Sequence, residues 1–302
     1  MNFLCPTCRN AFVVDDDLLL RSSQIPVPQE DVICPRGHRF AVENGVLALL
    51  DAEFGDRLAA FLAPFSGLRT AEDKRLVDPA AYPELPGGTA VQNEFEWRLR
   101  AYDLQVIEGL LASRPAQRAL DIGAWNGWLS NRLAALGHSA TAIDYFADEF
   151  DGLQARKFYT TRWLAIQMNL EDLAVIDQPF DVVIVNRCLA FYDDPVAYAK
   201  AAEQKVAAGG VLVLTGLGFV GDPRQRVAGL ASLQATLQQH GTDFFKPMKG
   251  YLDFGDKARL QAMGVQLIPY PQLYLANLKS RLVRSAPRYC YGLKRVTYGS
   301  VA

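Results

Sequence analysis

The 302-residue sequence lacks long apolar runs, has only three histidines, and shows no excess of positive charge. No uninterrupted apolar stretch approaches about 18 residues, so we expect no membrane-spanning helix. The first residues, "MNFLCPTCRN", lack a basic segment followed by an apolar core, so we expect no secretory signal and a cytoplasmic location. The net charge of −2 and the hydrophobic content of 50% are typical of a globular protein with a sizeable core.

Positive charge is nevertheless concentrated at one end of the chain. Residues 257–302 contain eight Lys or Arg residues and no Asp or Glu, which leaves 23 basic and 33 acidic residues in the first 256 positions. A basic segment on an acidic body favours an anionic partner, although solvated surface charge alone gives the same pattern.

Only five cysteines are present, and three of them fall in the first 34 residues. "CPTC" supplies Cys5 and Cys8, and "CPRGH" supplies Cys34 and His38. Two close pairs of soft ligands, each within one turn, are typical of tetrahedral zinc, and a complete Cys3His set predicts a structural ion. Cys188 and Cys290 lie in apolar runs far from these pairs and are predicted to be packing residues.

The pattern of the chain predicts three parts. Residues 1–51 form a small zinc ribbon, in which the polar stretch 22–31 is a surface loop, and residues 52–112 form a helical connector. In residues 113–302 apolar strands alternate with helices, which predicts an α/β domain with a mostly parallel sheet. We expect an insertion near 218–255 to cap the substrate cleft of this domain.

The stretch "ALDIGAWNGWLS", residues 119–130, predicts a buried strand, a glycine turn and a helix. Ligands of such sheets bind at the carboxyl ends of the strands, near this first loop. Trp125 interrupts the spacing that a dinucleotide fingerprint needs, and Asp121 would repel a pyrophosphate. A carboxylate at this position instead suits a cofactor with a positive amino group, which points to S-adenosylmethionine.

From about residue 90 to the end, the chain resembles the class I S-adenosylmethionine-dependent methyltransferases. "LDIGAWNG" is similar to their first motif, Asp144 to the acid after their second strand, and "MNLEDL" to the segment that meets the adenine. "FDVVIVNRCLAFYDDP" and "AAGGVLVLTG" are similar to their fourth and fifth strands. The resemblance implies a doubly wound, seven-stranded Rossmann-like fold.

By this resemblance, the residues expected to bind S-adenosylmethionine are Asp121, Gly123, Ala124, Trp125, Gly127, Asp144, Tyr145, Asn169, Leu170 and Asn186. Two of them depart from the family pattern. Trp125 stands in place of the middle glycine, and Asn169 stands where an acid usually faces the adenine. Asn169 can still accept that hydrogen bond, and the Trp125 ring can turn outward while Gly123 and Gly127 allow close approach.

The zinc segment is similar to that of the large-subunit rRNA guanine-N1 methyltransferases, and related ribbons occur in enzymes of small-molecule metabolism. We therefore expect a methyltransferase that acts on a small molecule, and the basic segment favours an anionic one. RNA is the alternative acceptor, and a non-catalytic zinc-ribbon interaction protein is the second alternative. Residues 1–51 carry four arginines against seven acids, which disfavours RNA. DNA is not expected, because no "[DN]-P-P-[YF]" turn follows the fourth strand.

Methyl transfer requires alignment and desolvation, with a base only where the acceptor must lose a proton. Arg187 and Tyr192 follow the fourth strand and are candidates to line the gap between cofactor and acceptor. His240 is a candidate general base, although a lone histidine at the end of a polar helix is more often a surface residue.

Overall fold

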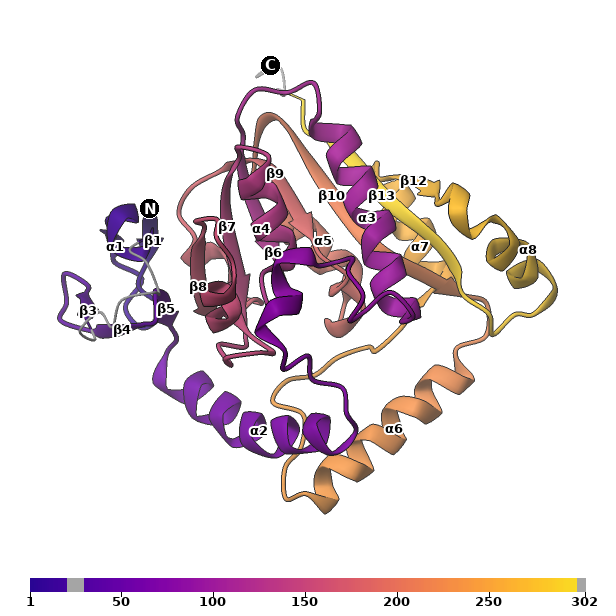
Figure 1. Cartoon of the computed structure of the whole chain (residues 1–302), viewed down its shortest axis with the longest axis horizontal. Helices are drawn as coiled ribbons and strands as arrows, with labels where there is room; N and C mark the ends of the chain where they lie inside the picture. The colour runs from indigo at the N-terminus through magenta and orange to yellow at the C-terminus, as the bar shows by residue number, and fades with distance from the viewer. Residues whose placement is uncertain (21–29, 298–302) are drawn as a thin grey trace.

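A computed structural model describes residues 1–20 and 30–297 of the chain, as shown in Figure 1. The predicted surface loop at 22–31 falls almost wholly outside these residues; Glu30 and Asp31 belong to a strand. The amino-terminal part contains β1 (Asn2–Leu4), β2 (Ala11–Val13), α1 (Asp16–Leu20), β3 (Glu30–Ile33), β4 (Arg39–Glu43) and β5 (Val46–Leu49).

The seven strands expected for the α/β domain are all present. They are β6 (Arg118–Ile122), β7 (Ser139–Asp144), β8 (Leu164–Met168), β9 (Phe180–Val185), β10 (Val206–Val220), β12 (Gln266–Pro269) and β13 (Arg288–Arg295). They lie in the order β8-β7-β6-β9-β10-β13-β12. Strands β6 to β10 are parallel and β13 is antiparallel to both of its neighbours. The predicted doubly wound Rossmann-like methyltransferase fold is thereby confirmed.

The sheet continues beyond these seven strands into the zinc segment. Val46 of β5 pairs with Ala165 of β8 in a parallel ladder, and β4 and β3 follow in antiparallel order. A short strand, β11 (Leu252–Asp253), pairs with the end of β10. The amino-terminal segment is therefore joined to the core by backbone hydrogen bonds as well as by the chain. Its separation as a domain at residue 51, like the boundary at 112, stays a prediction.

Helices cover both faces of the sheet. They are α2 (Ala52–Ala71), α3 (Phe95–Leu111), α4 (Trp128–Ala135), α5 (Pro195–Glu203), α6 (Arg224–Gln239), α7 (Phe254–Ala262) and α8 (Tyr274–Leu282), with 3-10 turns η1 (Pro79–Glu84), η2 (Leu153–Phe158), η3 (Leu173–Val175), η4 (Leu189–Phe191) and η5 (Pro271–Leu273). Alternate strand residues belong to opposite layers: Ala119 lies in the buried cluster that contains residues of α3 and α4, and Leu120 lies in the one that contains residues of α5, α7 and the β1–β2 hairpin. The strands are therefore apolar on both faces, as the sequence predicts.

Two helices differ from the sequence-based expectation. The helix expected over residues 148–158 is only the 3-10 turn η2, because Asp148 accepts the amides of Phe150 and Asp151 and closes a turn there. Helix α5 ends at Glu203, and the "AAGG" expected at its end lies in β10, where the ladder with β9 shifts register. Within the described residues, no helix is both long and apolar enough to cross a bilayer.

The stretch near 218–255, predicted to cap the substrate cleft, contains the end of β10, α6, the loop that follows α6, and β11; its capping role stays a prediction. This loop and α2 lie beyond the carboxyl ends of the parallel strands (Figure 1). Phe54 and Phe61 of α2 pack against Phe245 of the loop, and Phe54 also contacts Tyr145, which follows β7. The connector and the insertion together cover the edge at which a cofactor is expected.

Candidate cofactor and metal sites

The four predicted zinc ligands come together. The donor atoms of Cys5, Cys8, Cys34 and His38 all lie within 4.8 Å of one another. The two turns that hold them use left-handed backbone at Arg9 (φ 59°) and Gly37 (φ 86°), so that each pair of ligands faces the other. The Arg9 amide also donates to the Cys5 carbonyl oxygen at 2.8 Å and closes the first turn.

The distances between these donor atoms fit a tetrahedral ion. The Sγ atoms of Cys8 and Cys34 are 3.8 Å apart, and His38 Nδ1 lies 3.6 Å from Cys5 Sγ and 3.3 Å from Cys34 Sγ. Zinc with sulfur at about 2.3 Å and nitrogen at about 2.0 Å separates two sulfurs by about 3.8 Å, and sulfur from nitrogen by about 3.5 Å. The donor set and its spacing therefore suit zinc.

Asp121 is the second-last residue of β6 and is fully buried at the carboxyl edge of the sheet. Its two carboxylate oxygens accept hydrogen bonds from Ser130 Oγ at 2.8 Å and from Asn186 Nδ2 at 3.2 Å. Burial raises the pKa of Asp121 to about 7, although these donors oppose the rise. The carboxyl group is thereby held in place between the first and fourth parallel strands.

The glycine turn after Asp121 is closely packed. Gly123 (φ 73°) and Gly127 (φ 77°) both have left-handed backbone. A Cβ on Gly123 would lie 2.6 Å from Cys188 Sγ, and one on Gly127 would lie 2.2 Å from the Trp163 ring. Glycine is therefore required at both positions by the chain's own packing. Ala124, between them, is fully buried.

Trp125 also has left-handed backbone (φ 52°), the conformation that a glycine would adopt most easily. Its half-buried ring stacks on Trp97 of α3 with centroids 5.5 Å apart, and the guanidinium groups of Arg69 and Arg100 lie over it at 5.8 and 5.3 Å. The ring points away from the strands toward α2 and α3, and its burial offsets the backbone strain.

Asp144 ends β7 next to this turn. Its carboxylate accepts the amide of Trp125 at 2.7 Å and that of Phe146 at 3.0 Å. Burial raises the pKa of Asp144 to about 6 against the effect of these amides. The neighbouring Tyr145 ring packs among Phe54, Phe146 and Phe245, and its hydroxyl has no hydrogen-bond partner among the described residues.

The segment after β8 forms a tight turn. The side-chain oxygen of Asn169 accepts the Glu171 amide at 3.1 Å, so the oxygen expected to face an adenine closes this turn. Leu170 is buried in the core. Lys246, from the capping insertion, reaches Glu171 Oε1 at 3.4 Å and also donates to the Phe191 carbonyl oxygen.

Arg187 follows Asn186 at the end of β9 and also has left-handed backbone (φ 57°). Its guanidinium donates at 3.0 Å to Asp103 and at 3.0 Å to Glu96, both on α3. Asp103 is fully buried and also accepts the Tyr270 hydroxyl. Burial raises the pKa of Asp103, while the Arg187 charge opposes the rise.

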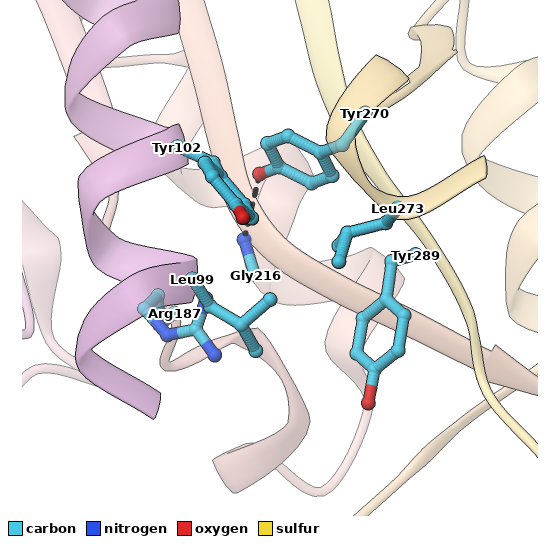
Figure 2. Close-up of a pocket in the computed structure, with 7 residues that line it drawn as sticks. All are labelled: Leu99, Tyr102, Arg187, Gly216, Tyr270, Leu273 and Tyr289. Atoms are coloured by element: carbon cyan, nitrogen blue, oxygen red, sulfur yellow. Dashed lines mark hydrogen bonds between the residues drawn. The ribbon is translucent and has the colours of Figure 1, made fainter. Parts of the chain in front are cut away.

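A narrow crevice, too small to hold a water molecule, lies beside this network. It is lined by Leu99, Tyr102, Arg187, Gly216, Tyr270, Leu273 and Tyr289. Figure 2 shows Tyr270, Leu273 and Tyr289 across from Leu99, Tyr102 and Arg187, with the Gly216 amide directed at the Tyr270 hydroxyl. Gly216 lies on β10, so the crevice adjoins the carboxyl ends of the fourth and fifth parallel strands.

The other two sequence candidates occupy different environments. Tyr192 is buried, stacks on Tyr198, and has the Lys246 ammonium 4.6 Å from its ring centroid. His240 is exposed at the end of α6, where its amide caps the helix. No hydrogen bond or ion pair among the described residues joins the His240 side chain to the carboxyl edge.

Residues that the sequence reasoning missed come mainly from α3 and the insertion. Asp103 and Glu96 hold Arg187, Trp97 holds Trp125, and Lys246 lies over the carboxyl edge. Asp103 did carry a signal, because it falls in the four-residue register of Leu99, Ile107 and Leu111 on the buried face of α3. An acid in an apolar register indicates a buried, partnered carboxylate.

Residues 120–214 match the family described as a methyltransferase domain. Over 140 residues the chain is 31% identical to the ubiquinone biosynthesis O-methyltransferase of Xanthomonas campestris pv. campestris, which covers 44% of this chain and 58% of the relative. The chain thus aligns with less than two thirds of the curated relatives it matches.

Two solved structures are also similar. An O-methyltransferase family protein from Burkholderia thailandensis is 16% identical, with 82% of this chain and 73% of that one covered and a TM-score of 0.44. The plantazolicin methyltransferase BpumL, solved with a triazolic desmethylPZN analog and SAH, is 13% identical, with coverages of 81% and 97% and a TM-score of 0.47. Neither structure is similar enough to support a functional assignment for this chain. The family match shows a methyltransferase domain over residues 120–214, and the strand order gives it the Rossmann-like fold of such domains.

Proposed function

We propose that this protein transfers a methyl group from S-adenosylmethionine to an oxygen atom of a small-molecule acceptor. The observation that carries the proposal is the methyltransferase-domain match, which spans Asp121, Asp144 and Asn186 at one edge of the sheet. The relative that is 31% identical over 140 residues is named as an O-methyltransferase, which supports oxygen as the methylated atom.

The residues at the carboxyl edge fit this cofactor. The buried carboxylate of Asp121 suits a cationic amino group. The carboxylate of Asp144 would accept hydrogen bonds from ribose hydroxyls in place of those that it now accepts from backbone amides. Tyr145 and Leu170 supply apolar walls, and the turn from Gly123 to Gly127 brings backbone close to a ligand. When bound, S-adenosylmethionine supplies an electrophilic methyl group on a sulfonium ion.

We place the acceptor beside Arg187, where the lining side chains would have to separate to admit it, because they leave no room for even a water molecule as they stand. Tyrosine and leucine side chains suit a planar or apolar body, and Arg187 suits an anionic substituent that competes with the exposed Glu96 carboxylate. Asp103 fixes Arg187 from the buried side. This arrangement positions an acceptor near the cofactor edge, which is the main requirement for in-line transfer.

We further propose that Cys5, Cys8, Cys34 and His38 hold a structural zinc ion. All four tetrahedral positions are filled by protein donors, so no position is open for a substrate. Because β5 of this segment pairs with β8, the ion would also stabilise one end of the central sheet.

RNA is less well supported as the acceptor. Two of the arginines of the zinc segment are already paired with acids, Arg9 with Asp172 at 2.6 Å and Arg39 with Asp31 at 3.2 Å. Phosphate binding needs uncompensated cations on one face. The resemblance of the zinc segment to rRNA methyltransferases and the cytoplasmic location both stay predictions.

Calorimetric titration with S-adenosylmethionine and S-adenosylhomocysteine tests the proposal. The zinc-loaded protein should bind both, and Asp144→Asn should weaken binding about 10-fold or more, because one carboxylate acceptor is lost. Asp181→Asn is the matched control, since Asp181 accepts the Arg118 amide at the opposite edge of the sheet. If the protein binds S-adenosylmethionine and then forms S-adenosylhomocysteine when phenols are added as acceptors, O-methylation would be supported. Absence of cofactor binding would leave the non-catalytic interaction protein as the better interpretation.

A further inference from the structure

Helix α8 (Tyr274–Leu282) lies at the end of the sheet farthest from the zinc segment, beyond β12 and β13 (Figure 1). It packs on the core along one side only. Ser280 is buried, and the Asn277 side chain exchanges two hydrogen bonds with the Tyr289 backbone, at 2.9 and 2.7 Å. The opposite side of the helix faces solvent.

That outer side is apolar. Leu275, Leu278 and Leu282 are 77%, 42% and 85% exposed. At 100° per residue, these three side chains fall within an arc of about 60°, and Tyr274 extends the same stripe. Single exposed leucines are ordinary on protein surfaces, but a continuous stripe on one helix indicates an interaction site.

Basic residues flank the stripe on both sides. Lys279 and Arg281 are exposed, and neither forms an ion pair with any residue in the ranges 1–20 and 30–297. Projected on the helix, Lys279 lies about 40° beyond one edge of the stripe and Arg281 about 20° beyond the other. The sequence from residue 257 onward contains no acid that could offset them.

We propose that α8 docks the protein on an anionic lipid bilayer, with its leucine stripe in the acyl boundary and its two cations among the headgroups. An amphipathic helix with apolar residues between two rows of Lys or Arg is the form that lies in the plane of a membrane interface. Anionic headgroups complement the two cations, which would repel each other if this face paired with a second copy of itself.

Docking would also orient the rest of the molecule. The turn η5 immediately precedes α8, and Leu273 of that turn lines the crevice together with Tyr270 and Tyr289. The residues that line the crevice beside Arg187 therefore adjoin the helix that would face the membrane. This inference rests on the charge and exposure of α8, and it holds whether or not the protein transfers methyl groups.

Flotation of the full-length, zinc-loaded protein with vesicles tests the proposal. We expect binding to vesicles that contain phosphatidylglycerol and little binding to phosphatidylcholine alone. Lys279→Gln together with Arg281→Gln should lower the partition coefficient about 30-fold, since each cation near an anionic surface contributes about 5-fold. Arg162→Gln with Lys200→Gln removes two exposed cations elsewhere and should leave binding unchanged.

The apolar stripe has its own matched pair of variants. Leu275→Ser with Leu282→Ser should abolish flotation, whereas Val227→Ser with Leu233→Ser, which changes two exposed apolar residues of α6, should not. Unchanged melting temperatures and cofactor titration would show that the α8 variants remain folded. The proposal would be overturned if the α8 leucine variant and the α6 control lost flotation equally, or if the protein showed no preference for anionic vesicles. Self-association in sedimentation that the α8 leucine substitutions abolish, without lipid binding, would instead make this face an interface between copies.

Discussion

The zinc segment and the carboxyl edge of the sheet differ in whether their functional groups already have partners within the chain. In the zinc segment, four donor atoms within 4.8 Å face one another in two short turns. At the carboxyl edge, both oxygens of Asp121 and both oxygens of Asp144 accept hydrogen bonds from neighbouring groups of the chain. Cys188 and Trp163 pack directly on the two glycines of the turn.

The difference lies in how far apart in the sequence the groups originate. Each pair of zinc ligands is set by one local turn, so only two pieces need to meet. The carboxyl edge combines β6, β7, β9, α2, α3 and the capping insertion, and each contributes packing or a hydrogen bond. A ligand there must exchange partners with the chain, so its affinity depends on many residues that do not touch it.

The largest effect expected is from loss of the zinc cluster. Cys34→Ser should abolish stoichiometric zinc and lower the free energy of unfolding by several kcal/mol, because metal binding to such sites is folding energy. Loss of order should also reach β8, whose ladder partner is β5. Zinc content by mass spectrometry and a thermal melt measure the two effects.

Cys290→Ser provides the control for that experiment, because Cys290 is buried in β13 at the other end of the sheet. It should keep one zinc per chain. Retention of stoichiometric zinc by Cys34→Ser would contradict the proposed ligand set. Loss of zinc without a change in the melting temperature of the central sheet would show that the β5–β8 ladder contributes little to the stability of the core.

The second effect concerns the charge of Asp121. Its pKa is about 7 in the folded chain, because burial disfavours the ionised form. Affinity for S-adenosylmethionine should therefore fall as the pH is lowered through 7, since the cofactor's amino group is attracted to the carboxylate. Asp121→Asn should weaken binding about 10- to 100-fold and remove this pH dependence. Titration at several pH values measures both, and a wild-type affinity that is constant across this range would contradict the proposed role.

Stability should change with pH in a related way. A raised pKa means that the folded chain holds the Asp121 proton between about pH 4 and pH 7, where the unfolded chain has released it. The free energy of unfolding should therefore fall as the pH rises through that window. Denaturant melts should show a smaller fall in Asp121→Asn than in the wild type.

A third, smaller effect is expected at Trp125. Trp125→Gly relieves a left-handed backbone that costs about 1 kcal/mol, but it also removes the stack on Trp97 and the contacts with Arg69 and Arg100. We expect a net loss of about 1–2 kcal/mol of stability with cofactor binding retained. Trp125→Phe keeps both the aromatic ring and the strain, and should lose less. A glycine variant that is more stable than the wild type would show that strain outweighs the stack.

Most of the fold could be predicted because its signals are local. Apolar runs bounded by glycine turns predicted the strands, and the order of motifs predicted the seven-stranded arrangement. The join between β5 and β8 could not be predicted, because "GVLALLD" gives the same pattern at an edge of a ribbon and inside a larger sheet. The short turn at 153–158 was missed because Asp148 closes the turn before it through hydrogen bonds that periodicity does not reveal.

The candidate site was only partly visible from the sequence. Ligand pairs such as Cys5 and Cys8 carry their geometry in their spacing, and Asp121 and Asp144 carry theirs in the strand ends. The partners of Arg187 could not be read in the same way, because Asp103 and Glu96 lie more than eighty residues earlier on α3. Only Asp103, an acid in the apolar register of α3, carries a sequence signal, which is that a buried carboxylate needs a partner.

The smallest effect is expected at His240. This residue is exposed at the end of α6. Its backbone amide donates to carbonyl oxygens of the last turn of the helix, and any other side chain at this position would leave that bond in place. A general base must come within hydrogen-bond reach of the proton it removes, and the described contacts of His240 are with its own helix. His240→Ala should therefore change the rate of methyl transfer by less than about twofold and leave its pH profile unaltered. Arg187→Lys is the informative comparison, because it keeps the charge but loses the fork that binds Asp103 and Glu96. If His240→Ala instead abolished methyl transfer while Arg187→Lys had no effect, the acceptor would have to bind beneath the 218–255 insertion rather than beside Arg187.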